Sequence, residues 1–249
     1  MNKQLAGLLP LIAMTTCALA QAEGTEDLAK RSADPTASLT SFNFRYVATP
    51  SYYGIDDEGG TVQFQPVVPF EAWGIKNILR ATISYDSAGP RGSGLADVTI
   101  FDLLVFDKPY GRWGVGPVLQ LLPDRGTGSD TVAAGPAIGF VTSKGRWTYG
   151  AFNQNLFGGN NTSISSLQPV LAYQLGSGWA LSAGDAQWTM DWERGGWVNL
   201  PLGVQLSKVG AIGGQAVKWT LNPEYNMRDL DGAPEWTVRL GFSILVPGG

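Results

Sequence analysis

The sequence has no histidine and a single cysteine, Cys17. Without imidazole the chain cannot build a Ser-His-Asp triad, and it lacks the ligands of the usual zinc and haem sites. We therefore expect no enzymatic activity, no catalytic residues, no metal site and no cofactor. One cysteine cannot form an internal disulfide, so backbone pairing and burial have to stabilise the fold.

Charge and long apolar runs are also scarce. Charged residues make up 15% of the chain, compared with roughly 25% in soluble domains, and the formal net charge is −4. No basic tract is present, which argues against nucleic acid as a partner. No apolar run after the first twenty or so residues reaches the ~20 residues that a membrane helix requires.

The N-terminus reads as an export signal. Lys3 supplies a positive charge, an apolar stretch follows, and Ala18-Leu19-Ala20 matches a cleavage site. We expect residues 1–20 to be a signal peptide, so that the mature chain begins near Gln21 and contains no cysteine. Lipidation of Cys17 is the alternative, although the residues before it are a poor lipidation motif.

Glycine, aromatic residues and alternating polarity are abundant, with 33 glycines in 249 residues. Successive side chains of a strand point to opposite faces, so an alternating run has one apolar and one polar face. In the clearest example Val198, Leu200, Leu202, Val204 and Leu206 alternate with Asn199, Pro201, Gly203, Gln205 and Ser207.

About twelve such runs follow one another. The candidate strands are residues 39–47, 61–70, 77–85, 95–106, 113–122, 131–142, 146–157, 164–175, 179–192, 198–207, 215–225 and 235–246. Short turns alternate with longer Gly-, Asn- and Asp-rich loops, as in outer-membrane barrels. An even strand number suits closure, which removes the open edge that hydrocarbon cannot tolerate.

These features predict an all-β fold, a single transmembrane antiparallel β-barrel of about 12 strands with a short N-terminal helix or turn. Residues 21–37 would form a segment in the periplasm or inside the lumen, and residues 38–249 the barrel. A soluble all-β domain is the alternative. The tryptophans fall mostly near strand ends, where they suit the lipid interface.

Six prolines occur within the runs: Pro66, Pro117, Pro136, Pro169, Pro201 and Pro223. Each removes a donor from the strand ladder, so we expect bulges or strand ends at these positions.

Several segments resemble a known family. They include Asp27 to Lys30, Gln63 to Phe70, Gly114 to Pro117, Gly145 to Ala151 and Leu167 to Pro169. The chain resembles the bacterial outer-membrane barrels called neuromedin U-like proteins, related to those named for a meta-pathway of phenol degradation. The resemblance implies a twelve-stranded barrel and a transporter role. The final residues, Val246 to Gly249, depart from the terminal aromatic residue common in outer-membrane barrels.

Eleven polar residues lie on faces that we expect to point into the lumen, where charge is tolerated. They are Arg45, Gln63, Gln65, Arg80, Thr82, Gln168, Asn199, Gln205, Lys218, Glu224 and Arg239. They would either line a narrow channel or fill the barrel with a satisfied polar network, and the strand number does not decide between the two.

Acidic residues offer weaker alternatives. Asp56, Asp57 and Glu58 could bind calcium but more simply solvate a loop. Asp185, Asp191 and Glu193 could serve glycoside hydrolysis only if they converged.

We therefore expect a protein of the Gram-negative outer membrane. Its function would be a passive channel or transporter for a small molecule, hydrophobic or aromatic by family analogy. The alternative is a structural or interaction barrel with a filled lumen and no transport. Expected partners are outer-membrane lipid, the barrel-assembly machinery and an unidentified small solute.

Overall fold

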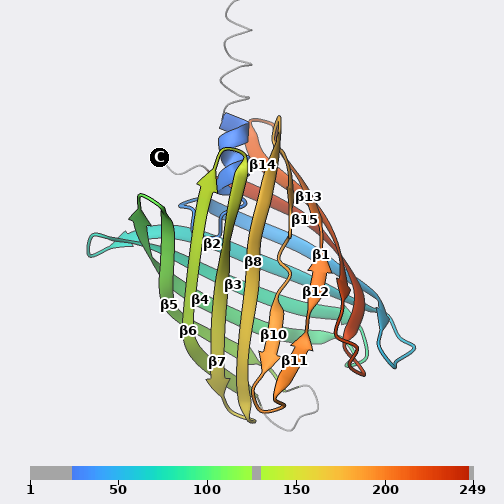
Figure 1. Cartoon of the computed structure of the whole chain (residues 1–249). Coiled ribbons are helices and arrows are strands. Elements are labelled where there is room, and N and C mark those ends of the chain that lie inside the picture. The colour runs from blue at the N-terminus through green and yellow to red at the C-terminus, as the bar shows by residue number, and fades with distance from the viewer. Residues whose placement is uncertain (1–23, 125–129, 247–249) are drawn as a thin grey trace, which may run out of the picture.

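The computed structural model describes residues 24–124 and 130–246. One antiparallel sheet closes into a barrel of tilted strands (Figure 1). Its strands are β1 (Thr40–Tyr52), β2 (Gly59–Ala72), β3 (Ile75–Ala88), β4 (Gly94–Lys108), β5 (Gly111–Leu122), β6 (Thr131–Lys144), β7 (Trp147–Gly158), β8 (Thr162–Gly176), β9 (Trp179–Ser182), β10 (Trp188–Asp191), β11 (Gly196–Asn199), β12 (Pro201–Gly203), β13 (Gln205–Ile212), β14 (Gln215–Asn226) and β15 (Pro234–Val246).

The sheet closes because β1 pairs with β15 from Thr40↔Val246 to Tyr52↔Pro234. β9 and β10 both pair with β8 and act as one interrupted strand. β11, β12 and β13 form the next interrupted strand, between β9 and β10 on one side and β14 on the other. The predicted twelve-stranded all-β barrel is therefore confirmed.

The ninth and tenth predicted strands were wrong in one respect, since neither is continuous. Residues 183–187 leave the sheet between β9 and β10, where Gly184 has a φ of 68°. In the tenth, Leu200 and Val204 separate three short strands, and a register shift places Trp197 opposite Met190. Alternation in the sequence persists through such breaks, so it could not reveal them.

We expected the prolines to mark bulges or strand ends, but some of them lie inside continuous strands. Pro117 pairs with Pro136 across β5 and β6, whereas the register with the other neighbour skips both positions. Pro66 likewise pairs with Phe42 of β1 but faces a gap in the β2–β3 ladder. A proline can stay inside a strand where the side lacking the N–H faces an interruption.

The two ends of the barrel differ. The turns at one end, such as Trp73-Gly74 and Ser177-Gly178, contain two residues each. Trp73 and Ser177 have φ values of 52° and 51°, followed by glycines at 74° and 78°, as tight hairpin turns require. The loops at the opposite end are longer, for example residues 53–58 and 227–233. We call these the short-turn end and the loop end.

Large apolar side chains cover the outer wall of the barrel, and no other part of the described chain buries them. Leu79, Leu119, Ile138, Leu202 and Leu240 are between 41% and 53% exposed. Aromatic residues lie above and below this belt, with Trp147 and Trp219 toward the short-turn end and Tyr85, Trp192 and Trp236 toward the loop end. An apolar belt between two aromatic rims matches the hydrocarbon and interfaces of a bilayer. None of the helices in the described residues is long and apolar enough to span a membrane.

We expect Leu240→Arg to destabilise the protein in lipid vesicles by about 2–4 kcal/mol, because it places a charge on the middle of the apolar belt. Leu240 is 53% exposed and lies halfway along β15. Unfolding in urea, followed by tryptophan fluorescence, would measure the loss. Leu240→Ala is the control, since it removes apolar surface without adding charge. Equal stability of the arginine variant and the wild type would contradict a lipid-facing belt.

One sector of the outer wall is polar, and it includes part of β7. Trp192 Nε1 donates to Ser165 Oγ at 2.9 Å, and Ser165 Oγ donates to Asn155 Oδ1 at 2.6 Å. Asn155 Nδ2 then donates to Asn153 Oδ1 at 2.6 Å. These side chains satisfy one another, which lowers the cost of facing an apolar medium.

The short N-terminal helix, residues 24–31, stands at the short-turn end (Figure 1). Ala29 and Leu39 pack there against Val209 of β13 and Leu245 of β15 in a buried cluster. The expected signal peptide, residues 1–20, lies outside the described residues, as do Pro247 to Gly249 at the C-terminus.

Candidate functional site

Three cavities follow one another along the interior of the barrel. The inner cavity, of about 130 Å³, lies nearest the short-turn end. The central cavity is about 360 Å³, and the outer cavity, near the loop end, is about 470 Å³. Arg45, Arg80 and Asp185 line both the inner and central cavities, whereas Gln63 and Arg239 line both the central and outer ones. The cavities therefore form one column separated only by side chains.

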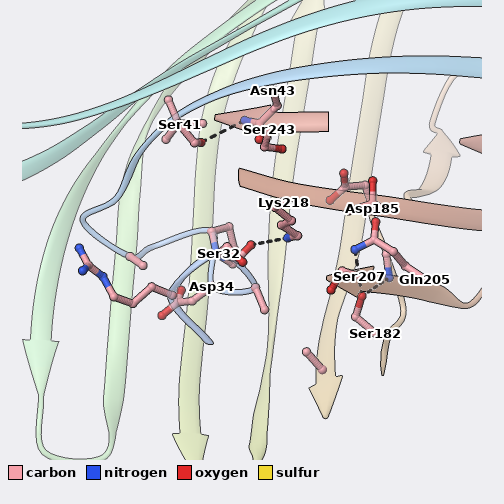
Figure 2. A pocket seen from close by; sticks show the side chains of 18 of the residues that line it. Ser32, Asp34, Ser41, Asn43, Ser182, Asp185, Gln205, Ser207, Lys218 and Ser243 are labelled. Atoms are coloured by element: carbon pink, nitrogen blue, oxygen red, sulfur yellow. Dashed lines mark hydrogen bonds between the residues drawn. The ribbon is translucent and has the colours of Figure 1, made fainter. Parts of the chain in front are cut away.

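The N-terminal segment, residues 24–39, forms the inner end of this column. Arg31 to Pro35 line the inner cavity, and Thr36 is completely buried. Lys218 Nζ donates to Ser32 O at 2.9 Å (Figure 2). Arg112 also bonds Asp34 Oδ2 at 3.1 Å and Thr36 O at 3.2 Å, and Glu26 accepts from Ser177 N at 2.9 Å. Four polar contacts thus hold the segment to the wall.

An ion pair separates the inner and central cavities. Asp185 lies in the segment that leaves the sheet between β9 and β10, and its carboxylate is 2.7 Å from Arg45 Nη2 of β1. Gln168 Nε2 of β8 also donates to Asp185, at 3.1 Å. Gly184 makes this inward course possible, since a Cβ there would lie 2.5 Å from Asn222 Nδ2 of β14.

Two further cations on this wall have no carboxylate partner among the ion pairs of the described residues. The Arg80 guanidinium lies 4.1 Å from the Phe101 ring centroid, and its buried Nε has no hydrogen-bond partner. The Lys218 ammonium bonds only a backbone carbonyl of the N-terminal segment in the described structure. Together with Arg45 and Arg239, they place four cations in the electrostatic environment of Asp185.

Another inward carboxylate, Glu224, is buried in the wall. Its side chain is 1% exposed and accepts from Arg239 at 2.9 Å and from Asn222 at 2.6 Å. Thr237 donates to the same carboxylate at 3.3 Å. Glu224 therefore neutralises Arg239 and orders β14 against β15.

We expect Glu224→Ala to lower the free energy of unfolding by about 3 kcal/mol, because it leaves Arg239 and Asn222 without their buried acceptor. Thermal unfolding in detergent would measure the change. Glu224→Gln keeps the volume and one acceptor, so it should cost less. If the alanine variant unfolded at the same temperature as the wild type, Glu224 would not stabilise the packing of β14 against β15.

The structure places most of the predicted site residues on these cavity walls. Arg45, Gln65, Arg80, Gln168, Gln205 and Lys218 line the inner cavity. Arg45, Gln63, Gln65, Arg80, Thr82, Gln168, Asn199 and Arg239 line the central cavity. Glu224 lines none of the three cavities and is instead bound within the wall. Whether these residues bound a route for solutes stays a prediction.

The three carboxylates considered for glycoside hydrolysis have separate roles. Asp185 faces Arg45 in the interior, whereas Asp191 accepts from the backbone N–H groups of Glu193 and Arg194 in the turn after β10. Asp56, Asp57 and Glu58 lie in the β1–β2 loop. Across residues 24–124 and 130–246, no cluster of three or more His, Cys, Asp or Glu could hold a metal ion.

Asp185 is one of several interior residues that sequence reasoning did not assign to the lumen, among them Asp97, Gln120 and Gln154. Its only signal was Ala183-Gly184-Asp185, which interrupts the alternation within a predicted strand. The contribution of residues 31–39 to the inner cavity was also not assigned, because the choice between a lumenal and a periplasmic position had been left open.

Comparisons with known proteins bear on the fold. No protein-family model matches the chain, and neither does any curated protein sequence. Among solved structures, an outer membrane channel from Pseudomonas putida F1 is 13% identical, with a TM-score of 0.55, covering 86% of this chain and 99% of that one. This likeness shows a shared barrel fold and does not single out the neuromedin U-like group.

Two outer membrane phospholipases are also similar. The Escherichia coli enzyme is 11% identical over 84% of this chain and 96% of that one, with a TM-score of 0.44. A Salmonella typhi phospholipase, solved as a dimer with bound calcium, is 10% identical over 90% and 98%, with a TM-score of 0.48.

These matches overturn the expectation of no enzymatic activity, since similar barrels include enzymes. TM-scores below 0.5 carry no argument about a particular reaction here. The absence of histidine from the chain still excludes a histidine-dependent mechanism.

Proposed function

We propose that this protein is a passive channel or transporter for small polar solutes in the outer membrane of a Gram-negative bacterium. The observation that carries the proposal is the column of three cavities, joined by shared wall residues, inside a closed barrel with an apolar outer belt. The inner and central cavities are lined mainly by polar groups. The family resemblance in the sequence supports the same role.

The interior chemistry favours polar over hydrophobic solutes. Amides, hydroxyls and charges line the inner and central cavities, including Gln65, Gln168 and Gln205. A hydrophobic solute would displace water from these groups and would not replace the hydrogen bonds that the water made. The hydrophobic or aromatic cargo expected by analogy therefore has less physical support than a small hydrophilic one.

Liposome swelling with the purified chain tests the proposal. We expect flux of small hydrophilic solutes that falls steeply with solute size, because two side-chain constrictions divide the column. Empty liposomes and liposomes that contain the heat-denatured chain are the controls. Absence of flux for every solute, with and without the N-terminal segment, would contradict the proposal and favour a structural barrel with a filled lumen.

A further inference from the structure

The charges in the interior are unbalanced at one level of the barrel. Arg45, Arg80 and Lys218 line the inner cavity together with the carboxylate of Asp185. Arg31 and Asp34 of the N-terminal segment also line it, but they form ion pairs with Asp27 and Arg112. Asp185 is fully engaged, since it contacts Arg45 at 2.7 Å and accepts from Gln168 at 3.1 Å. Glu224, which is buried in the wall, neutralises Arg239. Arg80 and Lys218 are therefore left without a counterion from the described residues.

Such a charge is costly in a confined site. Arginine remains protonated in proteins, so Arg80 cannot lower this cost by losing its proton. Its Nε is buried and has no acceptor, and the Arg80 side chain lines both the inner and the central cavity. An anion that entered these cavities would gain from the charge of the Arg80 guanidinium.

We infer that the boundary between the inner and central cavities is a binding site for a small oxyanion, a carboxylate or a phosphate. Arg80 and Lys218 provide the charge, with Ser207 and Gln205 nearby on the same cavity wall (Figure 2). Asp185 is the internal competitor, because its carboxylate already occupies one side of the cation cluster. This inference rests on the proposed function, as it names the solute class that the column would select.

The position of Asp185 supports this competition. It belongs to the segment 183–187, which has left the sheet, and not to a strand. A carboxylate on such a segment can exchange its partners with less disruption than one on a paired strand. A ligand oxyanion that bound Arg45 would take over the acceptor role that Asp185 now fills.

Opposite effects of two substitutions provide the test. The full-length protein in detergent is titrated with sodium phosphate, and separately with sodium acetate, at constant ionic strength set with sodium chloride. The apparent melting temperature reports binding, because a ligand that binds only the folded state raises it in a concentration-dependent way. We expect a saturable rise for the wild type with at least one of the two probes.

Arg80→Gln should weaken the apparent affinity roughly tenfold, and Asp185→Asn should strengthen it by a similar factor, since each changes one nearby charge. Arg194→Gln is the matched control, because the Arg194 side chain is 75% exposed in a loop-end turn. A gain of affinity in Asp185→Asn cannot arise from misfolding.

The inference fails if neither probe gives saturable binding in the wild type and in Asp185→Asn. It also fails if both substitutions change the affinity in the same direction. Saturable binding without flux in liposomes would retain this site and contradict the transport proposal. Flux in liposomes without saturable binding would contradict this site and retain the transport proposal.

Discussion

Deletion of residues 24–38 should convert a closed or poorly conducting barrel into an open one. These residues form the inner end of the cavity column, and their removal leaves the β1–β15 closure untouched because that pairing begins at Thr40. We expect the ratio of open to closed time in single-channel recordings from planar bilayers to rise at least about tenfold, which corresponds to a shift of 1.4 kcal/mol in the closed–open equilibrium.

A milder version keeps the chain complete. Arg112→Gln combined with Lys218→Gln removes three of the four polar contacts that hold the N-terminal segment. Each partly exposed contact contributes about 1 kcal/mol, so we expect intermittent opening rather than permanent conductance. Lys76→Gln is the control, since Lys76 bonds Asp107 at 2.8 Å, as Arg112 does, but has no contact with the segment in the described structure. Unchanged conductance in both deletion and double variant would show that the segment is not the barrier.

Gly116→Val should prevent the barrel from assembling. A Cβ at Gly116 would lie 1.8 Å from the Asp102 carbonyl oxygen and 2.9 Å from the Asp102 carbonyl carbon. Both atoms belong to the backbone of β4, so no side chain can move aside and β4 and β5 would have to separate. We expect a loss of at least about 4 kcal/mol, in the range reserved for disrupted cores and backbones.

Gly210→Val is the matched control for this effect. Gly210 lies within β13, and a Cβ there would meet no atom within 4 Å. Heat-dependent mobility in detergent gels distinguishes folded from unfolded barrels. We expect the Gly116 variant to run as unfolded protein and the Gly210 variant to resemble the wild type. A folded Gly116 variant would show that β4 and β5 approach less closely than the structure indicates.

Much of this fold is predictable from the sequence because a barrel wall has two chemically opposite faces. Phe44 and Tyr46 point outward and Arg45 points inward, as their alternation indicates. The pattern fixes which face a residue occupies, since the side-chain period of a strand is two. It also explains why most predicted interior residues lie on cavity walls.

The interruptions and the closed end could not be predicted in the same way. Alternation describes single strands, whereas the inward turn at Gly184 depends on its approach to Asn222, two strands away in the barrel. The position of the N-terminal segment depends on distant partners such as Lys218 and Val209. Contacts between residues so far apart in the chain leave no periodic signal.

The prolines restrict how neighbouring strands can align during closure. A register shift of two residues between neighbouring strands would keep the apolar side chains on the outer face. Hydrophobicity alone therefore does not exclude such a shift. Such a shift would move Pro66, Pro117 or Pro136 from its interruption to a continuous part of the ladder. A neighbouring carbonyl would then lose its donor inside hydrocarbon, at a cost of several kcal/mol. These prolines therefore favour one register between neighbouring strands and penalise the other registers.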